Sequence, residues 1–246
     1  MDRMLYIAAD GAGQIQAAQA VNANNLANVG TTGFKAQFEA LRDLPLYGPG
    51  HASRVHTQSE TPGVDFSPGS MQATGRNLDV AVNGRGWIAV QAPDGREAYT
   101  RAGDLRVSPT GLLETGAGHP VLGDGGPISI PDAQAIEIAA DGTVSVLPVG
   151  QAPSTLAVVG RIKLVNPAQA DIERGGDGLM QMRDGAPALP AAGVRLASGV
   201  LESSNVNAVA ALTSMIQLAR QFETQVKLMK VAEETDAAST KLMNLG

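Results

Sequence analysis

The chain of 246 residues contains no cysteine. Disulfide bonds and thiolate metal sites are therefore excluded. Aromatic residues make up only 3% of the chain, whereas glycine alone occurs 29 times. This composition favours close packing of small side chains over a large aromatic core. No apolar run approaches the roughly 18–20 residues that cross a bilayer, so we expect no direct membrane insertion.

Basic residues are also scarce. The formal net charge is −6, and the five lysines are scattered along the chain. Because phosphate binding needs clustered Lys and Arg, nucleic acid is not an expected partner. The N-terminus has no basic start, apolar run or small-residue cleavage site of a secretory signal. We expect any export to use a route that does not read a cleavable signal peptide.

Proline is confined to the middle of the chain, where all fourteen prolines lie between residues 45 and 190. Residues 2–28 and 203–246 lack it and repeat apolar residues mostly at steps of three and four, which predicts a helix at each end. Ser204 or Asn205 can cap the start of the second helix. The apolar side chains that we expect to pack between subunits are Leu5, Ile15, Val21, Leu26, Val206, Val209, Leu212, Ile216, Phe222, Val226 and Met229.

The C-terminal helix is too long to serve a compact domain alone. About 40 helical residues extend ~60 Å, so their apolar stripe needs helical partners, as in a coiled coil. Gly11 and Gly13 each cost about 1 kcal/mol relative to alanine inside a helix. We therefore expect another backbone to approach the N-terminal helix there.

The middle of the chain carries short alternating apolar runs at roughly the 8–12-residue spacing of an all-β domain. Turn formers such as Pro93-Asp94-Gly95 and Asp141-Gly142 separate them. The predicted fold class is α+β, with long terminal helices forming a coiled-coil layer and a central domain of short antiparallel strands. The predicted segments are the N-terminal helix (1–33), a connecting loop or extended segment (34–76), the β-rich outer domain (77–202) and the C-terminal helix (203–246).

Residues with catalytic potential form no recognisable pattern. His51, His56 and His119 lack metal-ligand spacing and are interpreted as solvated loop residues. His-Glu-x-x-His, Gly-x-Ser-x-Gly and Walker sequences do not occur. Trp87, the only tryptophan, begins a predicted strand, where a core position is favoured over a ligand-stacking platform. We predict no catalytic, cofactor-binding or metal-binding residue, and no enzyme.

One motif is specific without being catalytic: Asn25-Leu26-Ala27-Asn28-Val29-Gly30-Thr31-Thr32-Gly33-Phe34-Lys35. It resembles the N-terminal motif of the bacterial flagellar rod and hook proteins. The resemblance continues, in the same order, through Arg76 to Trp87, Tyr99-Thr100-Arg101-Ala102-Gly103, Leu201-Glu202-Ser203-Ser204-Asn205-Val206 and Arg220-Gln221-Phe222-Glu223. Similarity therefore extends over nearly the whole chain.

Within the motif, we expect Leu26 and Val29 to continue the buried stripe of the helix. Asn28 and Gly30 are expected to end the helix in left-handed conformations, and Gly33 to permit the next turn. The stretch is then an elbow between a helical layer and a β layer.

The resemblance implies a structural subunit that polymerises into the drive shaft of the flagellum. Such subunits transmit torque through the periplasm, and their terminal helices line the export channel. The implied partners are further copies, the other proximal rod proteins, the distal rod protein and the flagellar type III export apparatus. The implied location is the basal body, spanning the periplasm.

Two alternatives remain open at this stage. The opening Met1-Asp2-Arg3-Met4-Leu5-Tyr6 and the compact length favour a proximal rod subunit, but a distal rod subunit of the same family is the first alternative. The second is a secreted β-rich binding module or glycan-acting enzyme.

Overall fold

The computed structural model describes residues 2–45, 55–148, 150 and 156–243. The chain forms two compact units. The helical unit comprises Met1–Val29, Ala36–Asp65 and Val206–Gly246, and the β unit comprises Gly30–Lys35 and Phe66–Asn205. The chain therefore crosses from one unit to the other four times. The predicted α+β class is confirmed.

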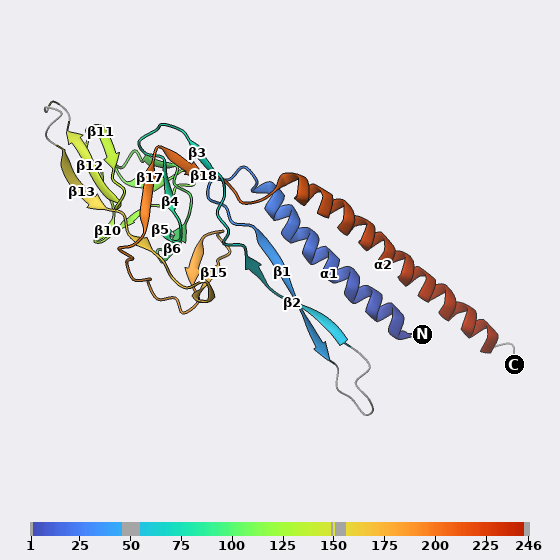
Figure 1. Cartoon of the computed structure of the whole chain (residues 1–246). Helices are drawn as coiled ribbons and strands as arrows, with labels where there is room; N and C mark the ends of the chain where they lie inside the picture. Colours follow the sequence, from blue (N-terminus) through green and yellow to red (C-terminus); the bar gives the residue numbers. More distant parts are fainter. Residues whose placement is uncertain (1, 46–54, 149, 151–155, 244–246) are drawn as a thin grey trace. The chain divides into compact units, whose positions relative to one another are not determined.

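The helical unit is built on two helices, α1 (Asp2–Ala27) and α2 (Ala208–Met243), which lie side by side (Figure 1). The Asn22 side-chain amide of α1 donates a hydrogen bond to the Ala211 carbonyl of α2 over 2.8 Å. Buried or half-buried side chains recur on α2 at alternating steps of four and three, the spacing of paired helices. They are Ala211, Met215, Leu218, Phe222, Gln225, Met229 and Ala232.

The apolar residues predicted along the C-terminal helix are not all equally exposed in the monomer. Phe222 and Met229 are half-buried, whereas Val209, Leu212 and Ile216 are exposed. The predicted residues advance by three more often than by four. On a helix of 3.6 residues per turn such a series winds around the axis instead of marking one side. The helix thus has a buried face toward α1 and a separate exposed apolar face, which also includes Val226.

The buried small residues of α1 are alanines, and not the two glycines that the sequence pointed to. Ala8 and Ala12 of α1 are buried, and Gly11 faces the Gln225 side chain, 3.3 Å from where a Cβ would stand. Gly13 has nothing within 4 Å of that position. Among the described residues, the atoms nearest the Gly11 position are those of the Gln225 side chain, so the expected close approach of another backbone is not found at either glycine.

A two-stranded antiparallel sheet completes the helical unit. Strands β1 (Gln37–Pro45) and β2 (Val55–Val64) pair with a register shift between Phe38 and Ala40, and both contact α1. The sequence predicted only a connecting loop or extended segment here. His56 lies in β2 and not in a loop, while His51 is outside the described residues.

The β unit consists of short antiparallel strands. They are β3 (Met71–Ala73), β4 (Val80–Asn83), β5 (Trp87–Gln91), β6 (Glu97–Thr100), β7 (Leu105–Val107), β8 (Leu113–Thr115), β9 (Leu122–Gly123), β10 (Gly126–Pro127), β11 (Ala133–Ile138), β12 (Thr143–Pro148), β13 (Ala157–Arg161), β14 (Leu164–Val165), β15 (Ile172–Arg174), β16 (Met180–Met182), β17 (Arg195–Ser198) and β18 (Val200–Glu202), with a 3-10 helix η1 (Gln169–Asp171). The largest sheet has the order β14-β5-β6-β16-β15, and a three-stranded sheet has the order β11-β12-β13.

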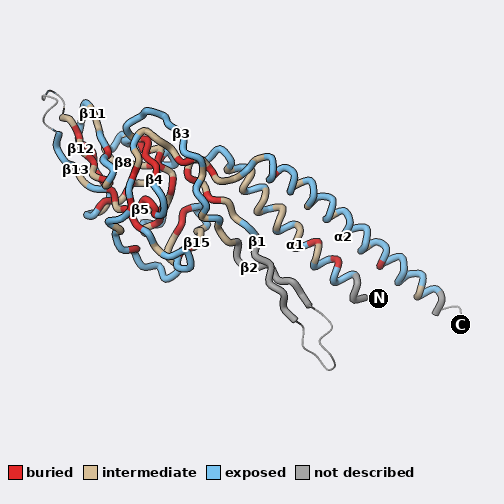
Figure 2. The backbone as a smooth tube through the Cα atoms, in the orientation of Figure 1, coloured by how far each residue is buried: buried red, intermediate tan, exposed pale blue. Residues whose placement is uncertain are grey.

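The apolar core lies in the β unit. Its members include Val80, Val82, Ile88, Val90 and Leu105, all with no exposed surface. Figure 2 shows the buried residues concentrated among these strands, whereas the helices carry only isolated buried positions. This unit can therefore hold side chains in fixed geometry. Among the described residues, neither helix is both long and apolar enough to cross a membrane.

Candidate functional site

Asn25, the first residue of the motif, ties the end of α1 to the start of β1. Its side-chain NH2 donates to the Gln37 carbonyl over 2.7 Å, and the Gln37 N–H donates back to Asn25 Oδ1 over 2.8 Å. The amide thus pairs with the strand backbone as another strand would. This paired contact fixes where β1 departs from α1.

The end of α1 does not have the predicted left-handed caps. Among the described residues only glycines have positive φ, and in the motif only Gly33 does, at +66°. Asn28 instead donates both its backbone N–H and its side-chain amide to the Asn24 carbonyl, over 3.1 and 2.9 Å. Because this carbonyl is satisfied by Asn28, no left-handed residue is needed to close the helix.

Gly30–Lys35, which we call the strap, belongs to the β unit although it follows α1 in the chain. The Gly33 N–H donates to the Glu202 carbonyl over 2.7 Å. A Cβ at position 33 would stand 2.2 Å from the Arg101 carbonyl carbon. Both this contact and the positive φ require glycine.

The strap ends in a buried ionic cluster formed by Lys35, Arg101 and Glu202. Lys35 Nζ lies 2.6 Å from Glu202 Oε1, and Arg101 Nη1 lies 2.8 Å from Oε2. Their side chains are 2%, 6% and 0% exposed, in the order Lys35, Arg101, Glu202. Backbone groups complete the cluster: Gly69 N–H donates to Glu202 Oε1, and Lys35 Nζ donates to the Ser67 carbonyl. Buried charges persist only when paired and hydrogen-bonded in this way.

Aromatic rings flank the two guanidinium groups near the strap. Arg101 lies over the ring of Trp87, 5.4 Å from its centroid, and Trp87 is buried as expected of a core residue. Arg174 lies 4.4 Å over the ring of Phe34 and donates to the Lys35 carbonyl over 2.6 Å. Burial lowers the pKa of Arg174. Phe34 is therefore held in place by a cation–π contact, an attraction that strengthens with desolvation.

The Glu202 carboxyl is held in its ionised form. Burial raises the pKa of Glu202, but hydrogen bonds from Lys35 and Gly69 and the charge of Arg101 outweigh burial, so the pKa lies below its ordinary value. A carboxyl with a lowered folded-state pKa stabilises the fold above its unfolded-state pKa. That stabilisation is lost as the pH falls through the folded-state value.

This sign gives a pH prediction for Glu202→Gln. Near pH 7 the variant should unfold at lower urea than the wild type, because it lacks the carboxylate. Below about pH 4.3, the usual glutamate pKa, the unfolded wild type takes up a proton that the folded carboxylate resists, so the difference should shrink as the pH falls toward the folded-state pKa. Urea titrations followed by Trp87 fluorescence between pH 3 and 7 measure this difference. A difference that stays constant down to pH 3 would contradict the assignment.

Ser204 and Asn205 do not start the C-terminal helix, contrary to the prediction. α2 begins at Ala208, and Asn207 caps it by accepting the Ala210 N–H at Oδ1 over 3.0 Å. Asn205 instead donates its side-chain amide to the Ser67 carbonyl over 3.1 Å, and Ser204 is buried. These residues are committed to the β unit, so the helix begins after them.

Sequence reasoning missed the roles of Glu202, Arg101 and Arg174. Two of them stand inside blocks that carried the family resemblance, Tyr99 to Gly103 and Leu201 to Val206. The pairing of Lys35 with a glutamate 167 positions away has no local signal. Leu26, Ala27, Thr31 and Thr32 lie at the elbow, where the Thr31 carbonyl accepts the Phe34 N–H over 3.3 Å.

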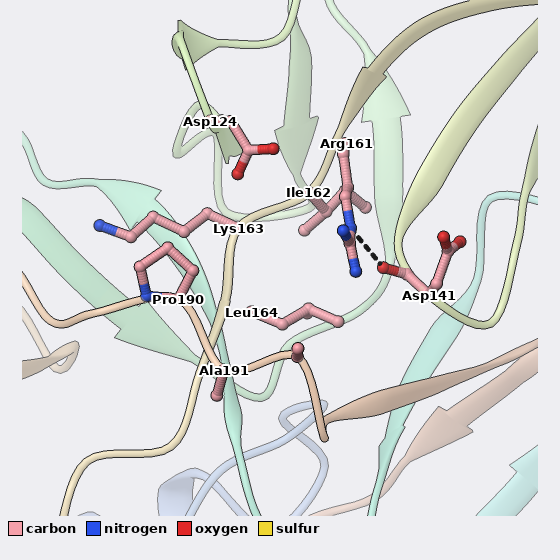
Figure 3. A pocket seen from close by; sticks show the side chains of 9 residues that line it. Asp124, Asp141, Arg161, Ile162, Lys163, Leu164, Pro190 and Ala191 are labelled. Atoms are coloured by element: carbon pink, nitrogen blue, oxygen red, sulfur yellow. Dashed lines mark hydrogen bonds between the residues drawn. The ribbon is translucent and has the colours of Figure 1, made fainter.

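The β unit also has a small hollow of about 100 Å³, lined by Asp124, Asp141, Arg161, Lys163 and their neighbours (Figure 3). Arg161 Nε donates to the Asp141 carbonyl over 3.0 Å, and Lys163 pairs with Glu97. Hydrogen bonds from Thr143 lower the pKa of Asp141, which makes it a weak base. The described residues contain no group of three or more His, Cys, Asp or Glu side chains placed to hold a metal ion.

The strap and the ionic cluster lie within regions that match known protein families. Family profiles match at three places: flagella basal body rod protein (residues 5–35), flagellar hook protein FlgE/F/G D1 domain (81–146) and flagellar basal body rod FlgEFG protein C-terminal (197–242). The flagellar basal-body rod protein FlgF of Salmonella typhimurium is 45% identical over 251 residues, covering 100% of both chains. The chain belongs to the flagellar basal-body rod protein family.

Other rod proteins match over almost the same length. FlgF of Caulobacter vibrioides is 34% identical over 98% of both chains. FlgG of Bacillus subtilis is 34% identical over 95% of this chain and 96% of its own. The strap lies in the rod protein profile, and Glu202 lies in the C-terminal profile. The ion pair between Lys35 of the strap and Glu202 therefore joins two segments that match the rod protein profiles.

Proposed function

We propose that the chain is a structural subunit of the flagellar basal-body rod, of the proximal type, and that it is not an enzyme. The observation that carries this function is the 45% identity to FlgF along the entire chain. FlgG of Bacillus subtilis shares 34%, less than the 45% of Salmonella FlgF, and this difference favours the FlgF type over the FlgG type.

The helical unit supports a role in assembly. Val209, Leu212 and Ile216 are 73%, 49% and 58% exposed on one face of α2. Each large apolar side chain left in water forgoes roughly 1.5–3 kcal/mol. Covering this face with helices of neighbouring subunits recovers that free energy. We place α1 and α2 in an inner coiled-coil layer that lines the export channel.

The elbow supports a role in force transmission. Four covalent connections join the helical unit to the β unit. Three of the segments next to them are hydrogen-bonded to one another around Glu202: the strap, Phe66–Ser70 and Ser203–Asn205. A buried, hydrogen-bonded cluster resists deformation better than separate loops. Torque applied to the helical layer thus reaches the β unit through segments that are hydrogen-bonded to one another.

The remaining partners follow from membership of the rod. The chain contacts further copies of itself, the other proximal rod proteins and the distal rod protein. It reaches the periplasm through the flagellar type III export apparatus and stays in the basal body. These assignments are supported by the family, and no part of them requires a cofactor.

A deletion experiment tests the function. Cells lacking the chain should be non-motile, and their purified basal bodies should lack a complete rod. The wild-type chain should restore both, and it should be found between the export apparatus and the distal rod. Motile cells in the deletion strain would reject the proposal, whereas a position next to the hook would favour the distal alternative.

A further inference from the structure

The strap belongs to the β unit, although the segments of chain on both sides of it belong to the helical unit. Val29 before it and Ala36 after it belong to the helical unit, and the rest of the β unit lies between Phe66 and Asn205. None of the described strand pairs of the β unit includes a strap residue. The strap can therefore leave the β unit without breaking a strand ladder.

The contacts that hold the strap form a short series. Gly33 N–H and the Phe34 carbonyl bond to the backbones of Glu202 and Asn205, over 2.7 and 3.3 Å. Arg174 covers Phe34, and the Lys35 ammonium bonds to Glu202. These contacts are made by Arg174, Glu202 and Asn205 of the β unit, which together form the docking site of the strap. The most buried of them is the Lys35–Glu202 ion pair.

The residues around Glu202 also have contacts that do not involve the strap. Glu202 keeps Arg101 on Oε2 and the Gly69 N–H on Oε1. Its backbone stays paired with Met71 in the β18–β3 ladder. Trp87 keeps its edge contact with Phe66. Removal of one partner usually leaves a buried charge unpaired, but here Arg101 still neutralises the carboxylate.

We propose that the strap is a latch, which docks on the β unit and leaves it as one piece while the rest of the unit stays folded. Glu202 is the positioning residue that holds the latch closed. The consequence for the flagellum rests on the proposed function. When the strap is docked, the chain that connects α1 to β1 is held on the β unit. When the strap is undocked, that connection is loose and transmits torque poorly.

Two glycines of the strap provide a variant that opens the latch and a matched control. An alanine at Gly33 would place its Cβ 2.2 Å from the Arg101 backbone at a φ of +66°, so the strap could not seat. Gly30 has nothing within 4 Å of a built Cβ and no positive φ, so Gly30→Ala is a matched control. Lys35→Met is a second opening variant, because it removes the ammonium but leaves the Glu202–Arg101 pair.

Hydrogen exchange on the full-length monomer, read by mass spectrometry, tests the latch. In the wild type, strap peptides should exchange at least tenfold faster than β5 peptides. Gly33→Ala should bring the strap to the unprotected rate with β5 unchanged, Lys35→Met should speed the strap at least threefold, and Gly30→Ala should match the wild type. Strap and β5 exchanging together in the wild type, or β5 losing protection in both opening variants, would overturn the proposal.

Swimming cells separate failure of the latch from failure of the proposed function. Gly33→Ala protein should enter basal bodies but give slow or broken rotation, whereas Gly30→Ala cells should swim normally. Normal swimming by Gly33→Ala cells would overturn the mechanical role of the latch and leave the subunit function intact. Absence of the wild-type chain from basal bodies would instead reject the subunit function.

Discussion

Glu202→Ala is expected to lower the free energy of unfolding of the β unit by about 3–5 kcal/mol, the usual cost of removing one partner of a buried ion pair. The carboxylate has no exposed surface and accepts hydrogen bonds from Lys35, Arg101 and Gly69. Its loss leaves cationic groups buried beside one another. Urea unfolding at pH 7, followed by the fluorescence of Trp87, measures the change.

The matched control is a glutamate of the same unit in an exposed ion pair. Glu173 lies 3.9 Å from Arg183, and both side chains are well exposed. Glu173→Ala should cost less than about 1 kcal/mol, as exposed pairs do. Equal effects of the two substitutions, or a loss below 1 kcal/mol for Glu202→Ala, would show that the cluster does not hold the β unit together.

Leu212→Asp is expected to abolish rod growth and motility while the monomer stays folded. Leu212 lies on the exposed apolar face of α2, so a carboxylate there meets water in the monomer. Surface changes of this kind usually alter stability by less than about 0.5 kcal/mol. In the rod the same carboxylate would be buried against a neighbouring helix without a partner, at a cost of several kcal/mol per subunit.

Thr213→Asp is the control for charge at nearly the same point of α2. Thr213 is exposed, and its hydroxyl donates to the Val209 carbonyl over 2.9 Å, but it lies on a different side of the helix from Leu212. Cells with Thr213→Asp should swim, and cells with Leu212→Asp should not. Swimming by Leu212→Asp cells would remove the apolar face of α2 from the assembly.

The sequence was a good guide to elements with a local signal. The absence of proline and the apolar spacing located both helices, and the strand predicted to begin at Trp87 is β5. Ile128 and Ile130, in one of the apolar runs of the middle of the chain, are buried but lie outside the strands. A buried apolar run indicates burial more reliably than it indicates the type of element.

The candidate site was only partly predictable because its bonds join distant residues. The motif pointed to Gly33 and Lys35, but their partner Glu202 is set by the folded β unit. The start of α2 was misplaced because Asn205 and Asn207 are equally good caps in isolation. Tertiary hydrogen bonds to Ser67 engage Asn205 and leave Asn207 to cap the helix.

A single cysteine on the exposed face of α2 tests the central claim most directly. The chain has no native cysteine, so Ile216→Cys provides the only thiol for a photoactivated cross-linker. In purified basal bodies this position should be joined to another rod subunit, and in intact rods it should react poorly with a maleimide. A chain absent from the basal bodies, or a thiol that reacts in rods as fast as in the monomer, would contradict the account.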